Sequence, residues 1–258
     1  MRRTALLKAR TEELGRSNTE LEQFAYIASH DLQEPLRKVQ AFGDMLTTQF
    51  RDVLGADGQD YLQRMQNAAK RMQGLINDLL NFSRVMTKAK PFVAVDLKTV
   101  AEQVVGDLES RIQQTGGRVE IGDLPSLDAD PLQMQQLLLN LIGNGLKYHR
   151  PGVAPLVSVR GQLMNSNDDR PGVISAEPIC EITVSDNGVG FDQKYAERIF
   201  APFERLHGRE FEGTGMGLAI CRKIVERHGG TITAQGTLDQ GAVFVAKLPV
   251  KHVEGVAL

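Results

Sequence analysis

The stretch NLIGNGLKY, residues Asn140–Tyr148, points to the fold of this chain more strongly than any other. Asn140, Asn144 and Lys147 are spaced i, i+4 and i+7, so one face of a helix presents two carboxamides and an ammonium group. Carboxamide oxygen is a hard ligand, and magnesium held by a nucleotide takes few protein ligands besides phosphate oxygens and water. The pattern favours a nucleotide site, although a polar stripe on an amphipathic helix explains this segment alone equally well.

Two glycine-rich segments downstream support a nucleotide site. DNGVGFD (Asp186–Asp192) follows a predicted strand, and its glycines allow a tight turn and close approach of a ligand. A buried carboxylate at Asp186 accepts a hydrogen bond from the amine of adenine, worth roughly 1.5–3 kcal/mol, whereas guanine has a carbonyl there. GTGMGL (Gly213–Leu218) opens a predicted helix, where backbone amides and the helix dipole meet phosphate. It is not a Rossmann fingerprint, because no strand leads directly into it.

The segment between these motifs, IFAPFERLHGREFE (Ile199–Glu212), is charged and is predicted to form a lid. Phe200 and Phe203 are expected to anchor it. The alternative is a solvated loop with two core phenylalanines.

The stretch SHDLQEPLR (Ser29–Arg37) lies in a long amphipathic helix near the N-terminus. The apolar stripe of this helix passes two positions to either side of His30, so the imidazole is predicted to face solvent. Pro35 costs ~3 kcal/mol or more inside a helix, so its place one turn after an exposed His-Asp pair suggests a function. Neutral imidazole is a nucleophile near neutral pH, and the carboxylate of Asp31 is placed to accept its proton or fix its tautomer.

Residues 4–88 are predicted to be helical almost throughout, with one reversal. Arg51–Asp60 (RDVLGADGQD) is rich in glycine and aspartate and is predicted to break the helix and turn the chain back. Each helix carries one apolar stripe that a lone hairpin cannot bury, so we expect two hairpins to pair as a four-helix bundle in a homodimer. The alternative is a hairpin packed on its own C-terminal domain. The stripes are Leu21, Ala25, Ala28, Leu32, Pro35, Val39, Phe42 and Leu46, then Leu62, Met65, Ala69, Met72, Ile76 and Leu79.

The basic, proline-containing stretch Met86–Phe92 is predicted to link this helical part to an α+β sandwich. Asp96 is expected to cap a helix that continues to about Gln114, and Asp130 with Pro131 to open the helix that carries the two asparagines. A further helix is expected near residues 216–228, and strands at residues 118–121, 156–163, 179–185, 231–235 and 242–248.

Composition narrows the class of protein. The chain has 258 residues, enough for two domains, since domains cluster near roughly 100–150 residues. Its formal net charge of −2 argues against nucleic acid as a partner. No apolar run approaches the ~20 residues of a membrane span and the N-terminus lacks a signal-peptide core, so a cytoplasmic location is expected. Cys180 and Cys221 lie in apolar stretches without metal-ligand spacing and are expected to be buried, without a disulfide.

The four segments in this order resemble the catalytic core of the sensor histidine kinases of two-component signalling, over about residues 20–250. The run HDLQEPL is similar to that of phytochrome-like and related hybrid kinases. The resemblance implies a dimeric four-helix bundle followed by an α+β ATP-binding domain of the kinase, chaperone and gyrase type. The implied parts are a signalling coiled-coil helix at 1–20, a dimerisation and histidine phosphoacceptor domain at 21–88, a linker at 89–92, a catalytic domain at 93–250 and a tail at 251–258.

The resemblance also implies a role for each motif residue. His30 would be the phosphoacceptor, Asp31 its acid/base partner, and Arg205 the arginine that reaches toward the γ-phosphate. Asn144 would be the Mg2+ ligand, with Asn140 supporting it near the phosphates. The implied ATP-binding residues are Asn140, Asn144, Lys147, Tyr148, Asp186, Gly188, Gly190, Phe203, Gly213, Thr214, Gly215, Gly217 and Leu218.

The implied activity is ATP-dependent autophosphorylation of His30, followed by transfer to an aspartate on the receiver domain of a response regulator. Leu7, Leu14 and Leu21 repeat at seven and look like the tail of a signalling helix, so an upstream sensor domain is expected. Glu34 departs from the family pattern. Many relatives carry Thr or Asn there, which positions the water that hydrolyses phospho-aspartate on the regulator, so we expect weak phosphatase activity.

Two other classes of protein remain open. Chaperone, gyrase and mismatch-repair ATPases share the ATP fold, but they need a catalytic acid a few residues before the magnesium asparagine. Gln135, Gln136 and Asn140 occupy that neighbourhood here, which disfavours hydrolysis as an end in itself. The third class is a non-catalytic dimerisation module that binds nucleotide without transferring phosphate.

Overall fold

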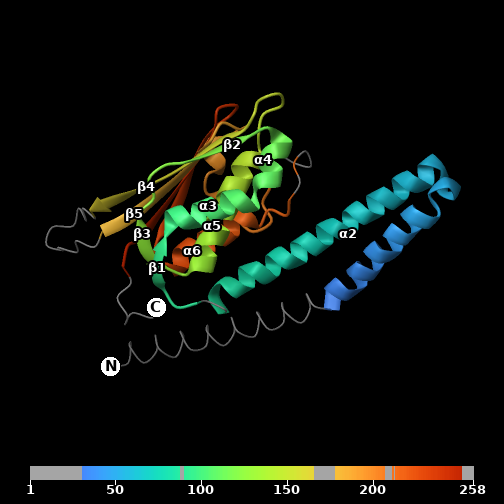
Figure 1. The fold of residues 1–258 in the computed structure, drawn as a ribbon, viewed down its shortest axis with the longest axis horizontal. Coiled ribbons are helices and arrows are strands. Elements are labelled where there is room, and N and C mark those ends of the chain that lie inside the picture. The colour runs from blue at the N-terminus through green and yellow to red at the C-terminus, as the bar shows by residue number, and fades with distance from the viewer. Residues whose placement is uncertain (1–30, 88–89, 166–177, 207–210, 212, 252–258) are drawn as a thin grey trace. The chain divides into compact units, whose positions relative to one another are not determined.

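A computed structural model describes residues 31–87, 90–165, 178–206, 211 and 213–251 of the chain. The chain divides into two compact units between Thr87 and Lys88. The first unit is a helical hairpin and the second is a sheet covered by helices (Figure 1). No helix among the described residues is both long enough and apolar enough to span a membrane.

The hairpin is antiparallel. Its first helix is described from residue 31 to residue 49, and α2 spans Arg51–Thr87. Two side-chain hydrogen bonds join the two arms. Gln33 Nε2 donates to Asn77 Oδ1 at 2.9 Å, and Gln66 Nε2 donates to Asp44 Oδ1 at 2.7 Å.

The reversal predicted at Arg51–Asp60 is present but narrower than expected. Phe50 forms a bend, and Gly55 inside α2 has φ 62° and ψ −180°, while the residues on both sides are helical. Glycine adopts this conformation without steric cost, and Asp52 in the first turn suits the positive end of the helix dipole. The predicted break and reversal are therefore confirmed, and helical residues continue on both sides of Gly55.

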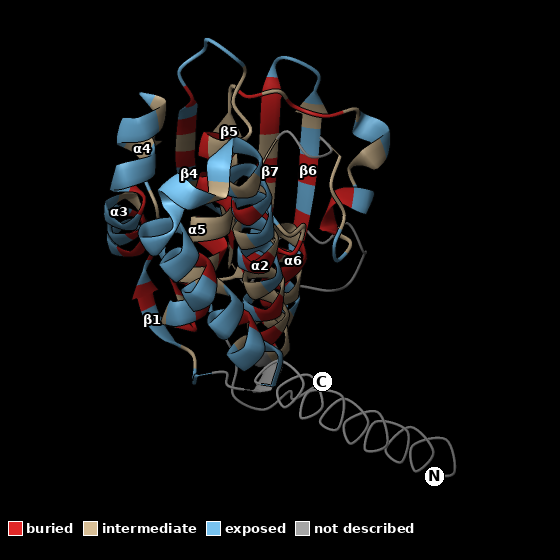
Figure 2. Ribbon diagram, turned by 90° about the vertical axis from the view of Figure 1, so that its right-hand side faces the viewer, coloured by how far each residue is buried: buried red, intermediate tan, exposed pale blue. Residues whose placement is uncertain are grey.

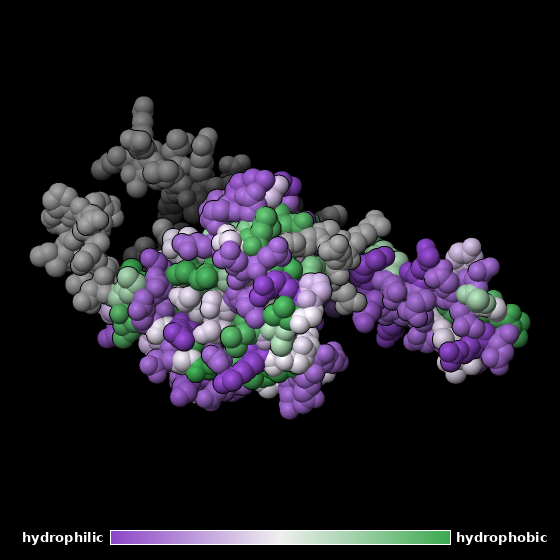
Figure 3. All heavy atoms as spheres, turned by 90° about the horizontal axis from the view of Figure 1, so that it is seen from above, coloured by the Kyte–Doolittle hydropathy of each residue, from purple (hydrophilic) through white to green (hydrophobic). Residues whose placement is uncertain are grey.

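Few apolar side chains are buried in the described part of the hairpin. Leu36, Ala69, Ile76 and Leu80 form one small cluster, and Leu62 and Val85 are also buried. Much of the predicted stripe remains exposed, and apolar patches lie among hydrophilic ones on the hairpin at the right of Figure 3. An exposed apolar surface of this kind usually marks an interaction site. The large exposed apolar side chains of the hairpin are Leu32, Val39, Phe42, Met45, Leu46, Phe50, Val53, Tyr61, Met65 and Met72.

The second unit is built on a five-stranded sheet in the order β2-β4-β5-β7-β6. β2 is parallel to β4, and every other neighbouring pair is antiparallel. Buried and exposed residues alternate along β6 (Figure 2), as expected for an antiparallel strand covered on one face. The strands are β2 Arg118–Ile121, β4 Leu156–Asn165, β5 Pro178–Asp186, β6 Thr231–Thr237 and β7 Gly241–Pro249.

Helices α3 (Leu97–Asp107), α5 (Pro131–Lys147) and α6 (Gly217–Arg227) cover one face of this sheet (Figure 1). The core between the two layers is closely packed, and the predicted α+β sandwich is confirmed. Its largest fully buried side chains include Leu137, Leu138, Leu141, Ile142, Leu146, Ile182, Ile220, Ile224 and Leu248.

Two details of this unit differ from the sequence prediction. The helix expected to reach Gln114 is divided at Leu108, after which α4 spans Glu109–Thr115. An antiparallel pair, β1 (Val93–Asp96) and β3 (Ser126–Ala129), was not expected. A run of four residues gives only a weak periodic signal, so these two strands were not predicted although β2, of the same length, was.

Candidate nucleotide site

A pocket of about 590 Å³, part of it open to solvent, lies beside α5, the end of β5 and the start of β7. Cys180 and Cys221 are buried and form no disulfide, and neither lines the pocket. Its apolar lining consists of Phe191, Ile199, Leu206, Leu218, Ala242 and Phe244. Its polar lining consists of Asn144, Tyr148, Asp186, Glu204 and Arg205, and the backbone of Gly190 completes the wall. An apolar pocket with a few polar groups is the usual form of a small-molecule site.

Asp186, the last residue of β5, is held in the pocket wall by the backbone. Its Oδ1 accepts hydrogen bonds from the N–H groups of Gly188 at 2.8 Å and Ala242 at 3.2 Å. Within the described part of the chain, Oδ2 has no hydrogen-bond partner. Burial raises the pKa of the Asp186 carboxyl, against the opposing effect of the two N–H bonds. The arrangement leaves one acceptor oxygen for a ligand.

The two asparagines of α5 have different surroundings. Asn144 lines the pocket. Asn140 lies one turn earlier, where its Nδ2 donates to the carbonyl of Gly217 at 3.3 Å and its Oδ1 accepts from Gln136 at 3.4 Å. Asn140 therefore ties α5 to the first residue of α6 and does not line the pocket.

Tyr148, at the end of α5, lines the pocket, and Lys147 precedes it as the last residue of the helix. Lys147 Nζ donates to the Tyr148 hydroxyl at 2.7 Å, and a Cβ added to Gly213 would lie 2.7 Å from Nζ. Burial raises the pKa of Tyr148, partly offset by the charge of Arg205. An ammonium group is thereby placed next to the glycine-rich segment.

Two glycines in the motifs are required by the backbone. Gly190 has φ 60°, and a Cβ there would lie 1.9 Å from the carbonyl oxygen of Thr237. Gly215 has φ 81°, and a Cβ there would lie 2.7 Å from the carbonyl oxygen of Glu204. Side chains at these positions would be both strained and too close. Thr214 supports the same turn, since its hydroxyl accepts from the N–H of Met216 at 3.3 Å.

Two short 3-10 helices lie at the entry to the predicted lid segment Ile199–Glu212. η1 (Gln193–Tyr195) precedes the segment, and η2 (Arg198–Phe200) overlaps its first two residues. Farther along, Arg205 Nη2 donates to the carbonyl of Phe211. The Phe211 ring lies 5.0 Å from the Tyr148 ring, measured between centroids. The arginine and the tyrosine of the pocket are thus both in contact with this one residue.

Only one of the two expected aromatic anchors is buried. Phe200 is 3% exposed and packs edge-on against Phe244. Phe203 is 54% exposed and has φ 64°, so the expectation that it anchors the segment is wrong. The reason is the close packing of the backbone at Phe203 and Glu204 against Gly215, which leaves the phenylalanine side chain outside.

The structure bears only partly on the histidine motif. His30 lies outside the described residues, as does the heptad stripe before it. Asp31 is the first described residue and is exposed, and Pro35 lies within the helix. The apolar lining of the pocket was not predicted. The alternation of residues along β7 would have indicated that Phe244 faces inward.

Two family models match successive parts of the chain. The His Kinase A (phospho-acceptor) domain matches residues 20–87. The histidine kinase-, DNA gyrase B-, and HSP90-like ATPase matches residues 129–252. The chain belongs to the sensor histidine kinases. In this kinase the described hairpin falls within the phospho-acceptor match, and the pocket falls within the ATPase match.

The most similar relatives include cyanobacterial phytochromes. The kinase is 36% identical over 251 residues to the phytochrome-like protein Cph1 of Synechocystis, covering 97% of this chain and 32% of that protein. It is 38% identical over 239 residues to cyanobacterial phytochrome A of Nostoc, covering 92% and 30% respectively. The kinase thus spans about a third of the length of these relatives.

Solved histidine kinases share the fold. Full-length ShkA in complex with AMPPNP matches with a TM-score of 0.64 and 25% identity, over 88% of this chain and 45% of that one. Histidine kinase ThkA in complex with the response regulator protein TrrA matches with a TM-score of 0.61 and 20% identity, over 93% and 66%.

Proposed function

We propose that this kinase uses ATP to phosphorylate His30 and passes the phosphoryl group to an aspartate on a response regulator receiver domain. An imidazole nitrogen attacks the γ-phosphorus, the bond to the β–γ bridging oxygen breaks, and ADP leaves. Asp31 accepts the imidazole proton. One observation carries the proposal: a phospho-acceptor domain precedes an ATPase-type domain that has a formed pocket.

An autophosphorylation assay with γ-phosphate-labelled ATP tests this function. Acid-labile, base-stable phosphate on the protein supports the kinase. Release of phosphate without labelling would instead support a clamp ATPase. A protein that shows neither labelling nor phosphate release would be an adaptor.

The residues of the pocket fit ATP with magnesium. Among the described residues no group of three or more His, Cys, Asp or Glu side chains gathers as a metal site. A magnesium ion would therefore be held by Asn144 together with the phosphate oxygens of the nucleotide, as magnesium usually is. When bound, it neutralises charge on the phosphates. Lys147, whose Nζ lies next to Gly213, and Arg205, which lines the pocket, would contact phosphate.

Replacing Asp186 by asparagine should reduce ATP affinity about 10- to 100-fold, because an acceptor for the adenine amine becomes a donor. The asparagine carbonyl still accepts from Gly188 and Ala242, so its amide nitrogen takes the place of Oδ2. GTP should lose less affinity or gain some. Calorimetric titration with both nucleotides measures the change. Because burial raises the pKa of Asp186, ATP binding should also weaken on acidification at a higher pH than an exposed aspartate would dictate.

The matched control is Asp192→Asn in the same motif. Asp192 is half-buried, caps η1 and pairs with Lys194 at 2.8 Å, and it is not among the residues that line the pocket. Its ATP affinity should stay near that of the wild type. Equal ATP binding by Asp186→Asn and Asp192→Asn would contradict the adenine assignment.

The partners follow from the hairpin. We infer that two copies of the kinase pair through the exposed apolar side chains of their hairpins to form a four-helix bundle. A receiver domain would dock on the bundle near the histidine. Glu34 there is exposed and pairs with Lys38 at 2.9 Å. Weak phosphatase activity toward the regulator remains a prediction.

Replacing Phe42 by glutamate should raise the dimer dissociation constant roughly 100-fold or more, since an unpaired carboxylate would have to be buried. Phe42 is 63% exposed on the single hairpin. Light scattering across a dilution series measures the change. Thr48→Glu is the control, because residue 48 lies about 240° around the same helix. A Phe42→Glu variant that stays dimeric to the same dilution as Thr48→Glu would exclude this interface.

A further inference from the structure

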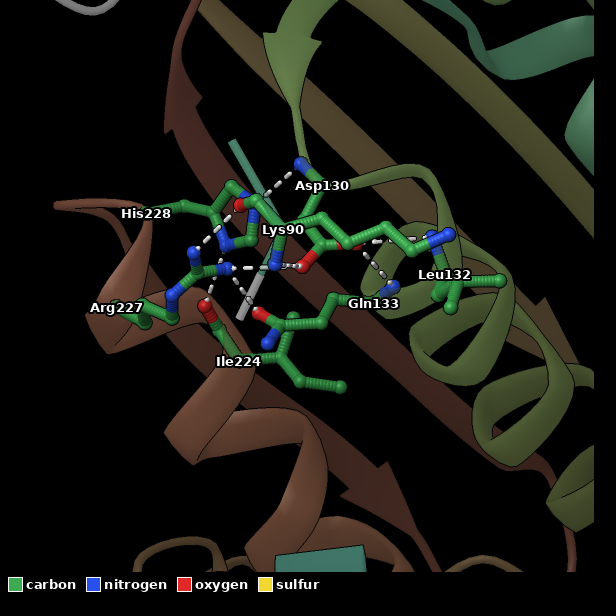
Figure 4. A network of polar contacts seen from close by, with 7 residues as sticks. All are labelled: Lys90, Asp130, Leu132, Gln133, Ile224, Arg227 and His228. Atoms are coloured by element: carbon green, nitrogen blue, oxygen red, sulfur yellow. Dashed lines mark hydrogen bonds and ion pairs between the residues drawn. The ribbon is translucent and has the colours of Figure 1, made fainter. Parts of the chain in front are cut away.

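A buried polar network lies where α5 begins and α6 ends (Figure 4). α5 runs from this network to Lys147 at the pocket, and α6 runs from Gly217 back to it. Asn144 follows Pro131 by 13 residues, about 20 Å along a helix. The network is therefore remote from the nucleotide, and the site described above does not account for it.

Asp130 is the centre of the network. It is 1% exposed, and its Oδ1 caps α5 by accepting from Leu132 N at 3.1 Å and Gln133 N at 3.4 Å. Its Oδ2 accepts from the backbone N–H of Lys90 at 2.7 Å. A cap needs only the first of these oxygens. The second attaches the segment that enters the domain from α2.

Arg227, the last residue of α6, attaches the same segment a second time. Its Nη2 donates to the carbonyl of Lys90 at 2.9 Å. Its Nη1 donates to Gln133 Oε1 at 2.8 Å and contacts Asp130 Oδ2 at 3.3 Å. The guanidinium also lies 4.8 Å from the centroid of the Phe92 ring. Both backbone groups of Lys90 are thus fixed to the domain, one through each partner of an ion pair between a buried carboxylate and a partly buried guanidinium.

His228 completes the network from the other side. It is fully buried, and its Nε2 lies 3.1 Å from the backbone N of Asp130, while Nδ1 lies 2.8 Å from the carbonyl oxygen of Ile224. A backbone N–H only donates, so Nε2 accepts and the proton sits on Nδ1, which keeps the ring neutral. The ring also stacks on Phe92 at 4.6 Å. Through these contacts His228 holds Asp130 and Phe92 in place.

We propose that Arg227 and Asp130 are positioning residues that fix the interdomain linker at Lys90, and so set the geometry of phosphoryl transfer without contributing to nucleotide binding. Lys90 follows the end of α2 by three residues in the sequence. The inference rests on the proposed kinase function. Transfer requires the reacting atoms to meet closely, and a misplacement of about 1 Å can cost about 100-fold in rate.

The test compares full-length wild type with Arg227→Gln at saturating ATP. We expect the autophosphorylation rate to fall about tenfold or more while ATP affinity stays within about twofold, because only positioning is lost. Arg227→Lys keeps a charge opposite Asp130 but loses the fork that also reaches Lys90, so its rate should stay low. A rate for Arg227→Gln within twofold of wild type, or full recovery in Arg227→Lys, would overturn the inference.

A destabilised domain could also lose rate, so Val225→Ala on the same helix is the matched control. Val225 is buried and has no side-chain hydrogen bond to the linker. If Val225→Ala lowers the melting temperature as much as Arg227→Gln and lowers the rate equally, the role is structural and the inference fails. Amide exchange at Lys90 distinguishes failure of this inference from failure of the proposed function. The Lys90 amide should exchange about tenfold faster in Arg227→Gln than in wild type. If it does so but the wild type does not label with phosphate, only the kinase function is refuted.

Discussion

Replacing His30 by glutamine should abolish labelling of the kinase by γ-phosphate-labelled ATP. Glutamine has a carboxamide of similar size, but its nitrogen is not nucleophilic, so no phosphoramidate forms. The expected loss is at least about 1,000-fold, the scale on which removing a covalent nucleophile acts. ATP affinity should not change, because the pocket is lined by residues between Asn144 and Phe244. Labelling on a gel and calorimetry with ATP give the two measurements.

His252→Gln is the control for this experiment. It removes one of the chain's four other histidines, and residue 252 lies close to the C-terminus in the sequence. It should label at the wild-type rate, with phosphate that is released by acid and kept in base. Persistent labelling of the His30→Gln variant with this chemistry would place the phosphoacceptor on another histidine. Loss of ATP binding in the same variant would instead show that the change disturbs the second unit.

The elements that sequence predicted well are those fixed by local chemistry. Asp96 and Asp130 cap their helices as expected, with side-chain oxygens accepting from the N–H groups of Lys98 and Leu132. Pro131 starts α5, where its missing N–H costs nothing. Alternating apolar residues predicted the long strands, and all five strands of the main sheet were expected. These signals need only neighbouring residues to act.

The predictions that failed depend on contacts between distant parts of the chain. The pair of β1 and β3 was not expected, because each strand is held by a partner that lies far away in the sequence. Phe203 is exposed, because its backbone packs against Gly215 twelve residues later. No pattern within either segment reports these contacts.

The candidate site shows the same division. The spacing of Asn140 and Asn144 correctly places both on one side of α5, but it cannot tell which one meets the pocket. That depends on the first residue of α6, Gly217, whose carbonyl accepts from Asn140. Sequence spacing likewise gave no sign that Arg227 and Asp130, 97 residues apart, form a partly buried ion pair.

Replacing Asn144 by alanine should remove the magnesium-dependent part of ATP binding together with labelling. Asn144 is the one carboxamide of the α5 motif that lines the pocket, so its oxygen is the proposed protein ligand of the metal. Loss of a metal that stabilises charge on transferring phosphate is worth several kcal/mol, so labelling should fall at least about 100-fold. Titrations with ATP in magnesium and in EDTA measure the binding difference, which should vanish in the variant.

Asn140→Ala gives the comparison that the structure makes possible. Asn140 is bound to Gly217 and Gln136 outside the pocket lining, so its loss should lower stability and labelling modestly and leave the magnesium dependence of binding intact. Asn144→Asp should recover part of the labelling, since a carboxylate keeps a hard oxygen ligand at the same position. If instead Asn140→Ala abolishes the magnesium dependence and Asn144→Ala keeps it, the metal is bound one helical turn nearer α6, and the two roles must be exchanged.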